Sequence, residues 1–132
     1  MIARFTLRSG FAAAVAGVGV LINGLYGAEL SATLLNPATE RVVREISISA
    51  VSLEFGWAAL LVWVAFRPTE RRGILLFTAI SMLLANTLHG VFQLDSAGVA
   101  ALAVNMAFGF IFAGLFVAAY VAAGPTQSAH IV

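Results

Sequence analysis

The chain has 132 residues, of which 61% are hydrophobic and only 10% charged, so it is far more apolar than an average soluble domain. Its formal net charge is +1 and its longest basic run is Arg71–Arg72, which argues against nucleic acid as a partner. Cysteine is absent, which excludes disulfides, thiolate metal sites and relays that work through thiols. We expect a single domain, residues 1–132, that resides in a membrane.

The first apolar run, residues 10–28, follows a short segment that contains Arg4 and Arg8. A secretory signal has a similar basic start, but this run is longer than a usual signal core and no A-x-A site closes it. We therefore interpret it as an uncleaved membrane span. Its small and polar residues recur at steps of three or four, so they should share one face that lets another helix approach closely: Ala12, Ala16, Gly19, Asn23 and Gly27.

The segment after the first span is less apolar and leads to Asn36 and Pro37. Asparagine is a good N-cap and proline is favoured as the first helical residue, so a helix is predicted to begin here. Two pairs of opposite charge with i,i+4 spacing are expected on its first turns: Glu40 with Arg44, and Arg41 with Glu45.

Four apolar runs have the length of a membrane span: residues 10–28, 46–66, 73–93 and 99–123. The second run should end before Arg67 and Pro68, because proline cannot continue the hydrogen-bond ladder. The turn at residues 94–98 offers Asp95 or Ser96 as an N-cap for the last run. Short second and third connections force antiparallel neighbours. The expected fold class is therefore all-α, an integral membrane up-down four-helix bundle.

The arginines predict the orientation, because positive residues in short loops stay in the cytoplasm. Five arginines precede the first span or lie in the turn after the second, on one side of the membrane: Arg4, Arg8, Arg67, Arg71 and Arg72. The other side has two, Arg41 and Arg44. We expect both termini in the cytoplasm and a multi-pass protein of the bacterial inner membrane, surrounded by lipid.

The second span contains one ionisable residue, Glu54. A carboxylate at the centre of a membrane helix costs roughly 2.5–3.5 kcal/mol and normally faces protein or water. At about 1.5 Å of rise per residue, Glu54 lies roughly 13 Å below the outer surface, and every other span has a polar residue in the same half. The candidate ligand-binding residues are Asn23, Glu54, Asn86, His89, Gln93 and Asn105.

The spacing of these residues indicates which faces meet. Asn86, His89 and Gln93 follow one stripe of the third span, and Ser47, Glu54, Ala58 and Leu61 follow one stripe of the second. A small-residue seam is expected on the fourth: Ala101, Asn105, Gly109 and Ala113. If the stripes face inward, Glu54 and His89 can satisfy each other. The same polar layer would also serve as hydrogen-bonded packing between helices, and both interpretations remain open.

A series of short motifs follows the order of the spans: Leu25-Tyr26-Gly27, Arg44-Glu45-Ile46, Glu54-Phe55-Gly56, Arg67-Pro68, Arg71-Arg72 and His89-Gly90. In this order the chain resembles the small bacterial four-helix membrane proteins of the DoxX-like type. The resemblance covers most of the chain and implies the four-span architecture. The thiol redox activity associated with some members would need cysteine, so the resemblance implies no activity for this chain.

Three functions fit these residues. In the first, the protein is not an enzyme: its pocket binds a small amphipathic or lipidic ligand, or the bundle docks on a larger membrane complex or forms a homo-oligomer. In the second, Glu54 and His89 act as an acid–base pair on an apolar substrate. In the third, an oligomer exports a substrate in exchange for a proton carried by Glu54.

No cofactor or metal is expected. A single histidine within the spans does not suit haem, and Glu54, His89 and Asp95 are an incomplete set for zinc. Phosphate-binding glycine loops and a serine-nucleophile arrangement are absent from the sequence.

Overall fold

The computed structural model describes residues 7–92 and 94–124, without the side chains of residues 95–97. The described residues form four α-helices: α1 (Leu7–Leu35), α2 (Arg41–Phe66), α3 (Arg72–Phe92) and α4 (Leu94–Ala122). Each contains a stretch long and apolar enough to cross a membrane, which in α4 is Gly98–Ala122. The chain is therefore an all-α, multi-pass membrane protein, as predicted.

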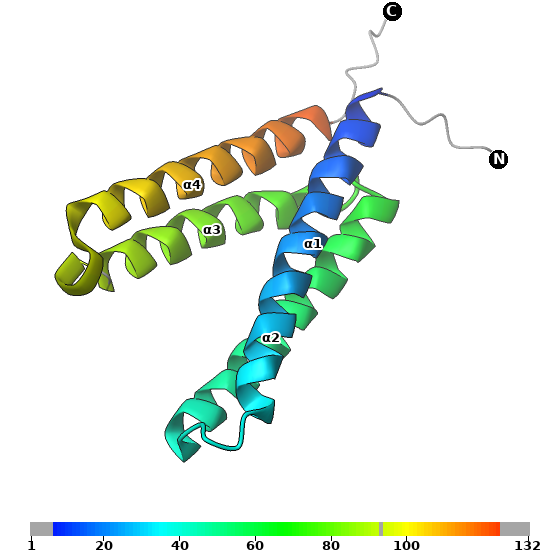
Figure 1. The fold of residues 1–132 in the computed structure, drawn as a ribbon. Coiled ribbons are helices and arrows are strands. Elements are labelled where there is room, and N and C mark those ends of the chain that lie inside the picture. The colour runs from blue at the N-terminus through cyan, green and yellow to red at the C-terminus, as the bar shows by residue number, and fades with distance from the viewer. Residues whose placement is uncertain (1–6, 93, 125–132) are drawn as a thin grey trace, which may run out of the picture.

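The helices pair as two antiparallel hairpins, α1 with α2 and α3 with α4 (Figure 1). The hairpins meet where α1 starts, α2 turns into α3 and α4 ends, and they diverge from there. We call the meeting point the closed end and the opposite side the open end. The predicted antiparallel order is confirmed. However, the hairpins do not pack along their whole length, so the bundle is splayed.

The hydrophobic core lies at the closed end. Its buried members are Ala12, Val15, Ala16, Leu61, Val64, Leu75, Ala79, Phe116, Ala119 and Ala123. Gly19 of α1 permits the closest approach there: an added Cβ would lie 2.7 Å from Leu61 Cδ1 of α2 and 2.8 Å from Phe116 Cζ of α4. Both neighbours are fully buried, so three helices converge on this glycine.

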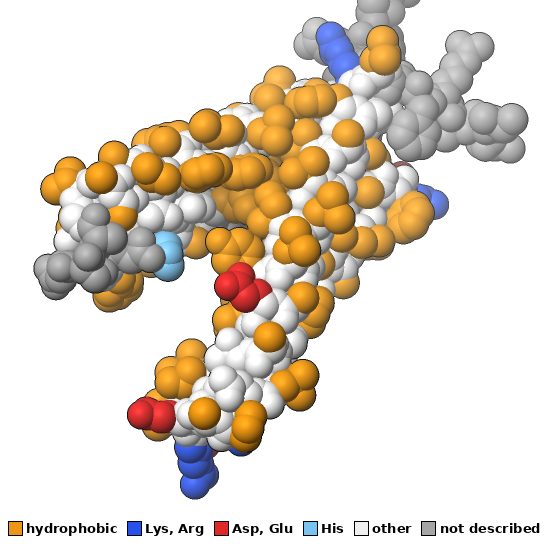
Figure 2. Space-filling model, viewed as in Figure 1, with side chains coloured by type: hydrophobic (Ala, Val, Ile, Leu, Met, Phe, Trp, Pro, Cys, Tyr) orange, Lys and Arg blue, Asp and Glu red, His pale blue; other side chains and the backbone are white. Residues whose placement is uncertain are grey.

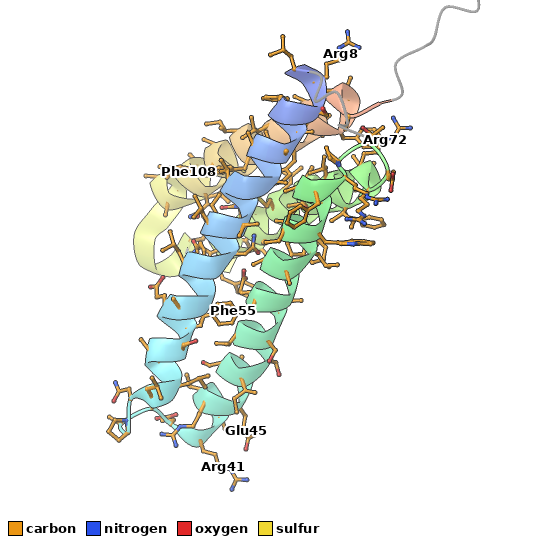
Figure 3. The ribbon with its side chains drawn as sticks, turned by 90° about the vertical axis from the view of Figure 1, so that its right-hand side faces the viewer. Arg8, Arg41, Glu45, Phe55, Arg72 and Phe108 are labelled. Atoms are coloured by element: carbon orange, nitrogen blue, oxygen red, sulfur yellow. The ribbon has the colours of Figure 1, made fainter. Side chains whose placement is uncertain are left out.

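Small residues lie at the contacts within each hairpin. Lipid is as apolar as a helix surface, so membrane helices associate through close packing and not through a hydrophobic driving force. The predicted small face of α1 is confirmed, since Ala12, Ala16, Gly19, Asn23 and Gly27 are all buried. At Gly27 an added Cβ would lie 3.1 Å from the ring of Phe55, which Figure 3 labels on α2. In the second hairpin, a Cβ at Gly109 would lie 3.1 Å from Asn86 Cβ, so the predicted seam of α4 faces α3.

The start of α2 differs from the prediction. This helix begins at Arg41 with Glu40 in the N-cap position, so the expectation that Asn36 caps a helix starting at Pro37 is wrong. Asn36 Oδ1 instead accepts a hydrogen bond from the Ala38 N–H (3.0 Å) within the loop. An asparagine side chain serves a helix start and a turn by the same local hydrogen bond, which explains the error.

One of the two predicted charge pairs forms. Arg41 Nε lies 3.0 Å from Glu45 Oε1 on the exposed first turn of α2. Arg44 does not pair with Glu40, because its Nη2 reaches back across the loop and donates to the Asn36 carbonyl (3.3 Å). Exposed i,i+4 pairs contribute only about 0.3–0.5 kcal/mol, so neither arrangement determines the fold.

The turn between α2 and α3 is fastened by two arginines. The second helix ends before Arg67, as predicted. The Arg71 guanidinium lies 3.8 Å from the centre of the Trp63 ring and also donates to the Trp63 carbonyl. The Arg72 guanidinium lies 5.1 Å from the Tyr120 ring of α4, which adds a contact at the closed end.

The connection between α3 and α4 is a helical turn that breaks at Gly98. This residue has φ 72° and ψ −174°, a conformation that in practice only glycine adopts. At the end of the predicted turn, residues 94–98, the chain therefore changes direction at Gly98. The sequence had predicted a side-chain N-cap for the last helix. The side chains of Asp95 and Ser96, the two candidate N-caps, lie outside the described residues.

Candidate functional site

A cavity of about 620 Å³ lies between the two hairpins and is lined by residues from all four helices. Figure 2 shows the hollow between the diverging arms, with a carboxylate side chain on the α1–α2 arm and a histidine on the α3–α4 arm at its border. The apolar core closes the hairpins on one side of this cavity, and their divergence leaves it accessible on the other.

Five of the six candidate ligand-binding residues line this one cavity: Asn23, Glu54, Asn86, His89 and Asn105. The sixth, Gln93, lies outside the described residues. The arrangement follows from the hairpins, since each antiparallel turn brings polar residues of similar depth to the same level. Whether these side chains bind a ligand stays a prediction.

Glu54 and His89 do not form the expected pair. The Glu54 carboxylate makes no hydrogen bond or ion pair with any described residue, and His89 has its interaction elsewhere. The two side chains belong to α2 and α3, on different arms of the splayed structure, so the cavity separates them. Glu54 thus lies in a candidate span without a counter-charge from the described residues.

The asparagines bond to their own helices. Each Nδ2 donates to the carbonyl four residues earlier: Asn23 to Gly19 (2.8 Å), Asn86 to Met82 (2.8 Å) and Asn105 to Ala101 (2.9 Å). One N–H of each of these amides is therefore used within its own helix. The Oδ1 atoms of Asn23 and Asn86 have no partner among the described residues and remain as acceptors on the cavity wall.

Trp57 and Thr78 join the two hairpins beside the cavity. Trp57 Nε1 of α2 donates to Thr78 Oγ1 of α3 (3.1 Å), and Thr78 Oγ1 donates to the Ile74 carbonyl (2.8 Å). Both residues also line the cavity. Because the indole N–H and the threonine O–H are occupied, Trp57 can offer a ligand only its ring.

The candidate ligand-binding residues taken from the sequence did not include Glu29 or Tyr26. Both line the cavity together with Ile22 and Asn23 of the same helix. Their spacing could have predicted this position. Ile22, Tyr26 and Glu29 are spaced by four and three residues, so they share one face of the helix.

Comparison of the chain with protein-family models, with curated proteins and with solved structures found no match. Of the resemblance to the DoxX-like proteins, the architecture of four long apolar helices stands, and no family is assigned. Among the side chains that the structure describes, no group of three histidine, aspartate or glutamate residues could hold a metal ion. What the site offers is a partly apolar cavity with convergent polar groups.

Proposed function

We propose that the protein binds one small amphipathic or lipidic molecule in the cavity between its hairpins, without catalysing a reaction. The observation that carries this proposal is the cavity itself, whose volume of about 620 Å³ falls within the range of about 300–1,000 Å³ typical of small-molecule sites. Its wall combines apolar Ile22, Leu53 and Met82 with the polar side chains of Glu54 and Asn86. That combination suits a molecule with an apolar body and a polar head.

Binding is favoured over acid–base catalysis because it requires less of the site. A general acid and a general base must each lie within hydrogen-bond distance, directly or through one water, of the substrate proton that it transfers. Glu54 and His89 line the cavity from different arms. Binding needs only that both walls contact the same molecule.

Filling the cavity tests the proposal. Ala85 of α3 lies in the cavity wall, so the Ala85→Phe ring should occupy the space that a ligand needs. Native mass spectrometry of the purified chain with dodecanol, dodecylammonium or dodecanoate measures the 1:1 complexes. We expect at least one such complex, and Ala85→Phe should weaken it by about tenfold or more, equivalent to about 1.4 kcal/mol.

The matched control is Ala103→Phe, because Ala103 is exposed on α4 and does not line the cavity. It should leave the 1:1 complex unchanged. Failure of all three amphiphiles to form a complex would contradict the proposed function, and so would an equal loss in both variants.

We also propose that the closed end faces the cytoplasm, with the chain in the inner membrane of the cell. Figure 3 shows Arg8 and Arg72 at the closed end and Arg41 at the far end of the first hairpin. Arg67 and Arg71 lie in the α2–α3 turn and add to the closed end. The excess of arginine at that end supports this orientation by the positive-inside rule.

The absence of native cysteine makes the orientation simple to test. Ala38 and Thr69 are both exposed, in the α1–α2 loop and the α2–α3 turn. In intact spheroplasts, a membrane-impermeant maleimide should label the Ala38→Cys variant, whereas Thr69→Cys should react only after permeabilisation. The reverse pattern would refute the orientation.

A further inference from the structure

The charged groups around the cavity are mostly of one sign. Glu54 of α2 and Glu29 of α1 contribute carboxylates to its wall, and the chain contains no lysine. No arginine lines the cavity within the described residues. The one wall residue that can carry a positive charge is His89, which forms no ion pair with Glu54.

The arginines whose contacts the structure describes lie at helix ends and in loops, away from the cavity wall. Arg41 pairs with Glu45, Arg44 binds the α1–α2 loop, Arg67 pairs with Glu70 (3.3 Å), Arg71 lies on Trp63 and Arg72 lies near Tyr120. None of them is placed to neutralise Glu54. A carboxylate inside a membrane helix is costly, so a counter-charge from outside the chain would be stabilising.

Some neutral groups of the wall suit the same ligand chemistry. The Trp57 N–H and the Thr78 O–H are occupied within the protein, while Oδ1 of Asn23 and Oδ1 of Asn86 accept no hydrogen bond from the described residues. Acceptors match a ligand that donates hydrogen bonds. The ring of Trp57 also lines the cavity, and the face of an indole attracts cations more strongly than other aromatic faces do.

We propose that the cavity selects amphipathic cations that carry N–H donors, namely primary or secondary ammonium headgroups on an alkyl or aryl body. This inference rests on the proposed function and adds the class of ligand. The ammonium group binds at the Glu54 carboxylate, and the apolar body packs against Ile22, Leu53 and Met82.

Three probes of equal chain length separate charge from hydrophobicity: dodecylammonium, dodecanol and dodecanoate. Their dissociation constants are measured by native mass spectrometry for the full chain in a neutral detergent near pH 7. We expect dodecylammonium to bind at least about tenfold more tightly than dodecanol, and dodecanoate to bind most weakly. Glu54→Gln should reduce the preference for the cation below about threefold, because the amide keeps the shape and removes the charge.

Two variants control for the loss of charge and for misfolding. Glu45→Gln removes a carboxylate from the same helix outside the cavity and should leave the preference unchanged. Glu54→Asp keeps a carboxylate in the cavity and should retain most of the preference for dodecylammonium. Loss of the preference in Glu45→Gln as well would contradict a site at Glu54.

The remaining outcomes distinguish this inference from the proposed function. If all three probes bind equally well, with affinity sensitive to Ala85→Phe but not to Glu54→Gln, the cavity binds ligands and the selectivity for cations is refuted. Tighter binding of dodecanoate than of dodecylammonium also refutes it. If none of the probes binds, the proposed function fails and the inference fails with it.

Discussion

Phe116→Ala is expected to lower the free energy of unfolding by about 3 kcal/mol. Phe116 is fully buried at the closed end, where α4 meets α1 and α2. Phenylalanine truncation in a soluble core costs about 3–5 kcal/mol. We expect the low end of this range, because lipid is as apolar as the core and mainly packing contacts are lost. Unfolding in dodecyl sulfate titrations of mixed micelles, followed by far-ultraviolet circular dichroism, measures the change.

Phe110→Ala is the matched control for this prediction. Phe110 lies on the same helix and is 58% exposed, so most of its ring lies outside the packed interior of the chain. Truncation at such a position should change the free energy of unfolding by no more than about 0.5 kcal/mol. Equal changes in the two variants would show that the junction at Phe116 does not hold the hairpins together.

The faces on which the helices pack could be predicted from the spacing of small residues. All five members of the predicted face of α1 are buried, and Ser47, Ala58 and Leu61 of the predicted stripe on α2 are buried too. Spacing is informative here because glycine and alanine permit a close approach that other residues prevent. The positions of the four spans could also be predicted, from the length and hydropathy of each apolar run. Span positions and packing faces both depend on residues close together in the sequence.

The angle between the hairpins could not be predicted, because it depends on contacts between residues far apart in the sequence. Within each hairpin, glycines mark the close approaches, such as Gly27 against Phe55. Between the hairpins, Phe116 packs against Gly19, and Trp57 donates a hydrogen bond to Thr78. The spacing of small residues predicted Gly19 as a packing position, but nothing in the sequence marks Phe116 or the Trp57–Thr78 pair as its partners across the hairpins.

The composition of the candidate site was more predictable than its internal bonds. Depth along each span placed Asn23, Glu54 and Asn86 at one level, and the structure brings them to one cavity. Depth does not fix the distance between opposite walls, so the pairing of Glu54 with His89 was wrongly expected. The same splay that separates these two side chains opens the space that we propose for a ligand.

Gly90→Leu is expected to destabilise the second hairpin by about 1–3 kcal/mol, the usual cost of overpacking a close contact. An added Cβ at Gly90 would lie 2.8 Å from Leu102 Cδ1 and 3.2 Å from Leu102 Cα, so part of the obstacle is the backbone of α4. A backbone cannot rotate away as a side-chain end can, and α3 must therefore move from α4. The dodecyl sulfate titration used for Phe116→Ala measures this loss.

Gly114→Leu controls for the added side chain, because nothing lies within 4 Å of a Cβ at Gly114. It should leave the free energy of unfolding unchanged or raise it by up to about 1 kcal/mol, because leucine has the higher helix propensity. Gly90 also lies next to Asn105 of the cavity wall, with 3.3 Å between an added Cβ and Asn105 Cβ. Movement of α4 should therefore weaken amphiphile binding in Gly90→Leu but not in Gly114→Leu. If Gly90→Leu lost stability and kept full binding, the cavity wall would not depend on the packing of α3 against α4.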